Sequence, residues 1–88
     1  MNSKHRKTLE AIFTNPVNPA IAWQDIESLF KSQGGIIREG KGSRVRFIMG
    51  EGKNTMVATF HRPHPQPDTD KGAVKSVRHF FESIGITP

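Results

Sequence analysis

Two consecutive hairpins are predicted in the middle of this chain. Residues 44–49 and 55–61 alternate apolar and polar side chains, and a shorter apolar stretch at 36–39 precedes them. Glycine-rich segments at 40–43 and 50–54 connect these runs. Alternation with a period of two is typical of strands that bury one face, and short glycine-rich connections favour antiparallel pairing. The pattern therefore predicts a three-stranded antiparallel sheet.

Three further segments place apolar side chains at helical spacing. They span residues 4–13, 22–33 and 71–84. The predicted order is helix, helix, three strands, helix, which is an α+β fold with two helices flanking the sheet and an extra N-terminal helix. Because this first helix precedes the central pattern, we assign residues 1–19 to an N-terminal helical extension and linker. Residues 20–88 form the central domain.

Proline, glycine and aspartate mark the predicted ends of the helices. Two prolines within residues 15–19 stop the first helix, because proline lacks an amide donor and restricts the residue before it. Gly34 and Gly85 end the other two helices, since glycine adopts the left-handed conformation at little cost. Asp68 or Asp70 stands near the cap position of the last helix.

Length, charge and the lack of cysteine narrow the possible functions. A chain of 88 residues makes one small domain. Its formal net charge of +5 favours a polyanionic partner, such as nucleic acid, an acidic protein or an anionic membrane. Without cysteine there can be no disulfide, no cysteine-based zinc site and no thiol nucleophile. The chain has no long apolar run, so we expect no membrane span and a cytoplasmic location.

Arginine and histidine side chains gather on one side of the predicted sheet. If Phe60 faces the core, His61 shares the outward face with Arg44 and Arg46. Cleavage of a phosphodiester chain without a metal needs a proton acceptor, a proton donor and positive charge at the phosphorane. Imidazole and guanidinium groups supply these functions near neutral pH. We therefore name His61 and His64 as candidate catalytic residues, and we expect neither a cofactor nor a metal site.

A second set of side chains is predicted to bind a phosphodiester backbone. Guanidinium forks match the geometry of a phosphate, and lysines near the start of a helix are common phosphate ligands. The predicted RNA-binding residues are Ser43, Arg44, Arg46, Arg62, Lys71 and Lys75.

Several motifs resemble those of the HicA toxins, which are small RNA-cleaving toxins of bacterial type II toxin–antitoxin systems. The similar elements are Gly42-Ser43 with the strand after it, His64-Pro65, the run from Lys71 to Val77, and Gly85-Ile86. The resemblance covers about residues 22–88. It implies a double-stranded-RNA-binding-domain-like fold and cleavage of messenger RNA without a cofactor. It also implies a HicB-type antitoxin that covers the active face, and an oligomeric state that is set by the antitoxin complex.

One position departs from the family pattern. Members of the family typically carry the catalytic histidine directly after Gly-Ser or one residue later, whereas Arg44, Val45 and Arg46 follow Ser43 in this chain. Arginine stays protonated and cannot act as a base. The leading hypothesis is a toxin ribonuclease that uses His61 or His64. The alternatives are a non-catalytic module that binds RNA or the antitoxin, and a DNA-binding regulator.

Overall fold

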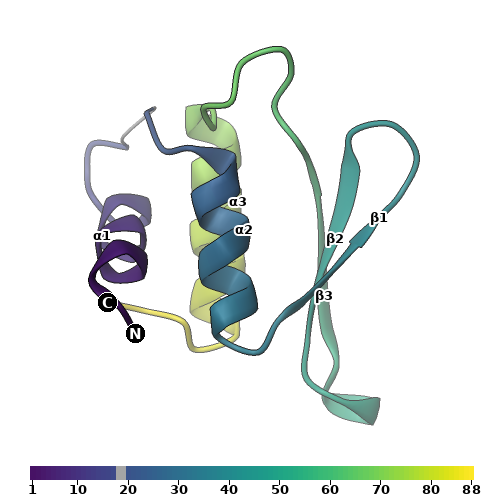
Figure 1. Ribbon diagram of the computed structural model, residues 1–88. Coiled ribbons are helices and arrows are strands. Elements are labelled where there is room, and N and C mark those ends of the chain that lie inside the picture. Colours follow the sequence, from purple (N-terminus) through teal and green to yellow (C-terminus); the bar gives the residue numbers. More distant parts are fainter. Residues whose placement is uncertain (18–19) are drawn as a thin grey trace.

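The computed structural model describes residues 1–17 and 20–88 and has the predicted order of elements (Figure 1). These elements are α1 (Ser3–Ile12), α2 (Trp23–Ser32), β1 (Ile36–Glu39), β2 (Arg44–Met49), the 3₁₀ turn η1 (Gly52–Asn54), β3 (Met56–His61) and α3 (Lys71–Ser83). Asn18 and Pro19, part of the predicted break after the first helix, lie outside the described residues. The predicted α+β class and three-stranded antiparallel sheet are confirmed, and they agree with a double-stranded-RNA-binding-domain-like fold.

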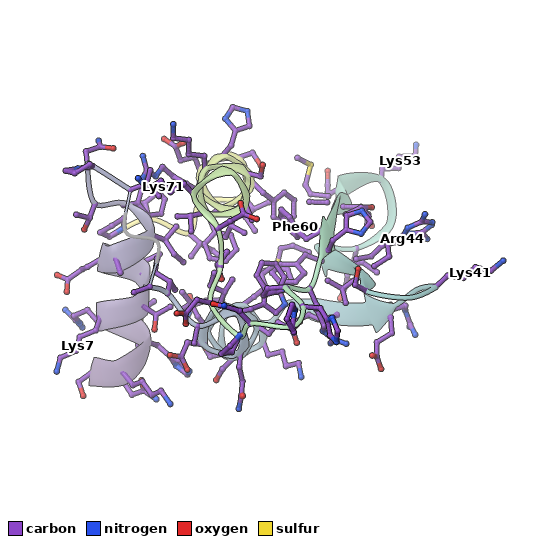
Figure 2. All side chains as sticks on the ribbon, turned by 90° about the horizontal axis from the view of Figure 1, so that it is seen from above. Lys7, Lys41, Arg44, Lys53, Phe60 and Lys71 are labelled. Carbon is purple, nitrogen blue, oxygen red and sulfur yellow. The ribbon has the colours of Figure 1, made fainter. Side chains whose placement is uncertain are left out.

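The helices cover one face of the sheet and leave the other face open. α2 and α3 lie against the sheet, and α1 lies on their far side (Figure 1). Figure 2 shows Phe60 pointing from the sheet toward the helices and Arg44 pointing away from them. Within residues 1–17 and 20–88, no helix is long and apolar enough to cross a bilayer.

The pairing of β2 with β3 fixes which side chains share a face. Arg44 lies opposite His61, and Val45 lies opposite Phe60. Residues directly opposite each other in an antiparallel pair project from the same face, and a slip of one residue would exchange the faces. The prediction that His61 shares the outward face with Arg44 is therefore confirmed.

Stacked aromatic rings support the inner face of the sheet. Phe30 of α2 stacks on Phe47 of β2 with ring centroids 4.5 Å apart, and on Phe81 of α3 with centroids 6.0 Å apart. All three rings are fully buried. Truncating such a ring to alanine costs about 3–5 kcal/mol, so this stack is a major source of the rigidity beneath the open face.

The predicted signals at the helix ends are present, and Asp70 rather than Asp68 caps α3. The carboxylate of Asp70 accepts a hydrogen bond of 2.8 Å from the amide of Ala73, whereas Asp68 forms a β-bridge with Ala22. Gly85 follows α3 with a φ of 81°, in the left-handed region that favours glycine.

α1 is joined to the rest of the domain through its apolar face and its C-terminal end. Leu9 and Ile12 belong to the same buried cluster as the side chains of α2, α3 and the sheet. Arg78 of α3 donates hydrogen bonds to the carbonyls of Ile12 (2.8 Å) and Thr14 (3.0 Å) and to Oδ1 of Asn15 (3.1 Å). The guanidinium thus satisfies carbonyls that a helix end leaves without partners. The division of the chain at residue 19 stays a prediction.

The start of the third strand differs from the prediction by one residue. The alternating pattern predicts a strand from Thr55, but β3 begins at Met56. The hydroxyl of Thr55 donates to the carbonyl of Gly52 at 2.8 Å, and its amide donates to the same carbonyl at 3.3 Å. These bonds close the 3₁₀ turn and hold Thr55 in it, because threonine hydroxyls compete for local backbone groups.

Candidate nucleic-acid interface

Three arginines line a hollow on the open face of the sheet. Arg38 of β1 pairs with Arg46 of β2, and Arg44 projects from the same face of β2. Together with Glu39 and Gly40 they surround a pocket of about 280 Å³. All three side chains are exposed, and no carboxylate among the described residues forms an ion pair with them. Guanidinium groups without counterions around a hollow form a suitable site for an anion.

Arg38 is absent from the residues predicted from the sequence. The stretch at 36–39 is too short for its alternation to show which side chains face outward. The register with β2 supplies the missing information, because Arg38 lies directly opposite Arg46 and Ile37 lies opposite the buried Phe47. The signal is therefore present only in the pairing of two strands.

His61 stands at the end of β3, directly across from Arg44. Its Nδ1 lies 3.4 Å from Oγ of Ser43, so the turn at 40–43 and the end of β3 are in contact. The imidazole is exposed, and no described residue forms a hydrogen bond with its Nε2. On its other side, His61 borders a pocket of about 300 Å³ with Asp70 and Ser76 of the α3 region. One ring nitrogen is thus placed against the turn, and the other is free to meet a substrate.

The segment between β3 and α3 carries His64 and is fixed at both ends. At its start, the amide of Arg62 donates to the carbonyl of Ser43 at 2.8 Å. At its end, the amide of Trp23 donates to the carbonyl of Pro67 at 3.0 Å, and the amide of Thr69 donates to the carbonyl of Ile21 at 2.8 Å. His64 is exposed on this tethered loop. His64 therefore lies on the segment that leaves the end of β3, three residues after His61.

Arg62, predicted to bind RNA, is engaged by two carboxylates. Its Nε and Nη2 donate to Glu27 of α2 at 2.8 and 3.1 Å, and its Nη1 donates to Glu39 of β1 at 2.5 Å. Glu27 also accepts a hydrogen bond of 2.5 Å from Nε1 of Trp23. The hydrogen bonds that Arg62 donates to Glu27 and then to Glu39 hold the pKa of Arg62 above its usual value. The guanidinium thus ties the residue after His61 to α2 and β1.

The predicted lysines and Ser43 occupy different surroundings. Lys71 and Lys75 are exposed on α3, and Lys75 lies against the groove between α3 and β3. The first turn of α3 is already occupied by the carboxylate of its own cap, Asp70. Ser43 is exposed beside His61. Figure 2 shows Lys71 on the side of α3 that faces away from Arg44. Lys75 lies in the groove beside β3, so of these three residues it is Ser43 that lies beside His61.

The residues at this end of the sheet combine two chemical capabilities. The arginine hollow can bind a phosphodiester and stabilise the additional negative charge of a phosphorane. The imidazole of His61 can accept or donate a proton across from Arg44. Directly opposite side chains in a sheet have Cβ atoms about 5 Å apart, so one phosphodiester can contact both groups.

Comparison with known proteins identifies the family. Residues 23–86 match the family model described as HicA toxin of bacterial toxin–antitoxin. The match begins at the first residue of α2, extends beyond α3 and covers most of the chain. The comparison with curated proteins and the comparison with solved structures gave no match. On this evidence, the chain belongs to the HicA family of toxins of bacterial toxin–antitoxin systems.

Proposed function

We propose that this toxin is an endoribonuclease that cleaves messenger RNA without a metal ion and is neutralised by a HicB-type antitoxin. The observation that carries the proposal is the hollow formed by Arg38, Arg44 and Arg46, with His61 directly across from Arg44. A polyanion fits the net charge of +5, and RNA is the target expected of a family of this kind.

The proposed reaction is a transesterification within the RNA chain, which releases a fragment with a 5′-hydroxyl end. A base removes the proton of the ribose 2′-hydroxyl, and the resulting oxygen attacks the adjacent phosphorus. The bond to the 5′-oxygen breaks, an acid protonates that oxygen, and a 2′,3′-cyclic phosphate remains. His61 and His64 are the candidates for these two proton transfers, and the arginines stabilise the charge of the phosphorane.

His61 can replace the histidine that the family places after Gly-Ser. In this chain that place is taken by Arg44, whose guanidinium cannot accept a proton. His61 lies directly across from Arg44 on the neighbouring strand. We infer that the imidazole has moved to β3 and that Arg44 has become a phosphate ligand. Ser43 Oγ, 3.4 Å from Nδ1, would orient the ring and leave Nε2 toward the RNA.

The test is cleavage of a labelled RNA by purified protein in excess EDTA. We expect products with 2′,3′-cyclic phosphate ends. We expect His61→Ala to lower the rate roughly 100-fold or more, because general acid–base groups contribute about 10²–10⁴-fold. His79→Ala, on the exposed side of α3, is the matched control and should cleave at the wild-type rate. Intact RNA with folded wild-type protein, or full activity of His61→Ala, would contradict the assignment.

A second candidate function follows from the presence of Arg44 where the family has a histidine. If the chain has lost catalysis with that histidine, it is a module that binds RNA or the antitoxin without cutting RNA. Cell growth discriminates the two, because a His61→Ala, His64→Ala double variant should lose toxicity only if the imidazoles carry the chemistry. Co-purification with a candidate HicB-type protein tests the proposed partner in both cases.

A further inference from the structure

The outer edge of β3 has unused backbone hydrogen-bonding groups. The amide of Arg62 donates to Ser43 at 2.8 Å, and pairing alternates along an antiparallel strand. Val57, Thr59 and His61 therefore turn their N–H and C=O groups away from β2. No hydrogen bond among residues 1–17 and 20–88 uses these groups. In the part of the chain that the structure describes, the sheet order β1-β2-β3 leaves this edge without a neighbouring strand.

A groove runs along this edge, between β3 and α3. Its volume is about 650 Å³, compared with about 280 Å³ for the arginine hollow on the open face. The aromatic rings of Phe60 and Phe80, both almost fully buried, lie at its base. Met56 and Val57, 43% and 53% exposed, continue the apolar surface along the strand. The groove therefore combines an apolar base with a row of free peptide groups.

The walls of the groove favour an acidic occupant. Lys75 and His79 project from α3 along it, and no carboxylate of the described residues lines it. An extended peptide can supply alternating donors and acceptors to a strand edge, as in β-augmentation. The phosphates of RNA only accept hydrogen bonds and cannot pair with the outward carbonyls of β3, whereas a peptide backbone supplies partners for both the N–H and the C=O groups.

We propose that the edge of β3 binds an extended, acidic segment of a partner protein as a fourth strand of the sheet. The segment pairs with Val57, Thr59 and His61. Its side chains on the face toward α3 include apolar groups that contact Phe60 and Phe80 and carboxylates that lie beside Lys75 and His79. The proposal concerns protein binding and does not rest on RNA cleavage, so an inactive His61→Ala variant remains suitable for testing it.

The probe is a library of random peptides of about nine residues, selected on the folded protein. We expect enrichment of sequences in which apolar and acidic residues share every second position, on the face toward α3, and alternate with residues of other kinds. Binding should slow hydrogen exchange at the amides of Val57 and Thr59. The amide of Ala58, which faces β2, is the internal control and should keep the rate it has in the free protein. Enrichment of basic or non-alternating peptides, or unchanged exchange at Val57 and Thr59, would overturn the proposal.

Two further measurements separate strand addition from other modes of binding. Two N-methylated forms of the selected peptide, methylated at the odd or at the even residues, should behave differently. Methylation of the amides that face β3 should abolish binding, and methylation of the amides that face away from β3 should leave it intact. A Lys75→Glu, His79→Glu variant should bind the peptide roughly tenfold more weakly, whereas Lys7→Glu on α1 should bind like wild type. Equal effects of both methylation registers, or protection of the edge amides by an RNA oligonucleotide and by no peptide, would refute fourth-strand binding.

Discussion

Replacing Glu27 by alanine should destabilise the domain far more than replacing Glu39, although both carboxylates bind the same guanidinium. The side chain of Glu27 is 13% exposed and that of Glu39 is 74% exposed. Glu27 accepts two hydrogen bonds from Arg62 and one from the indole of Trp23, whereas Glu39 accepts one from Arg62. Because both carboxylates bind Arg62, comparing the two variants isolates the effects of burial and of the number of hydrogen bonds.

The expected magnitude follows from these bonds. Hydrogen bonds to charged groups contribute about 1.5–3 kcal/mol each, but Arg62 is 36% exposed, and water replaces part of what Glu27→Ala removes. We expect a loss of about 2–3 kcal/mol for Glu27→Ala and about 0–1 kcal/mol for Glu39→Ala, the range of exposed ion pairs. In a domain of this size, the first loss lowers Tm by about 10–20 °C.

Urea denaturation followed by far-ultraviolet circular dichroism measures both free energies of unfolding. Glu27→Gln is a useful third variant, because its amide oxygen can still accept from Trp23 or Arg62 without the charge. It should fall between wild type and Glu27→Ala. Equal losses for the two alanine variants, or a loss below about 0.5 kcal/mol for Glu27→Ala, would show that Arg62 is not anchored through α2.

Three other predictions concern separate parts of the molecule. Arg46→Ala should weaken RNA binding. The slope of the logarithm of the binding constant against the logarithm of the salt concentration should fall in magnitude by about 0.7, as expected when one phosphate contact of a single strand is lost. An unchanged slope in binding titrations would show that Arg46 is not part of the interface. Arg78→Ala should cost about 2 kcal/mol and expose α1 to limited proteolysis, because it removes the hydrogen bonds to Ile12 at the end of α1 and to Thr14 and Asn15 just after it. Arg38→Ala should leave the digestion pattern as it is. Asp70→Ala should cost about 1 kcal/mol in thermal denaturation through loss of the α3 cap, and a similar loss for Asp68→Ala would contradict the assignment of the cap.

The strands and the open face are predictable because their signals are local. Alternation at 44–49 gives the two faces of β2, and the short loop at 50–54 places β3 beside it. Once these strands are neighbours, the common face of Arg44 and His61 follows from the pleat. The helix ends are readable for a similar reason, since Gly85 and the cap residue act within one turn.

The partners of the charged side chains are not predictable from local pattern. Arg62 binds Glu27, 35 residues away, and Arg78 binds the carbonyl of Ile12, 66 residues away. From the sequence alone, both guanidinium groups are expected to be charges on the surface. Only the packing of α2 and α1 brings their acceptors close. The groove beside β3 is not predictable from local sequence either, because one wall comes from the sheet and the other from α3.

The bond between Trp23 and Glu27 provides a built-in optical reporter. Trp23 is the sole tryptophan of the chain, and its indole N–H donates to the same carboxylate that holds Arg62. Indole emission depends on polarity and on nearby charge, so a ligand that pulls Arg62 away from Glu27 changes the emission wavelength. If RNA or an antitoxin displaces Arg62, its binding can be followed by intrinsic fluorescence, without a dye attached to the surface.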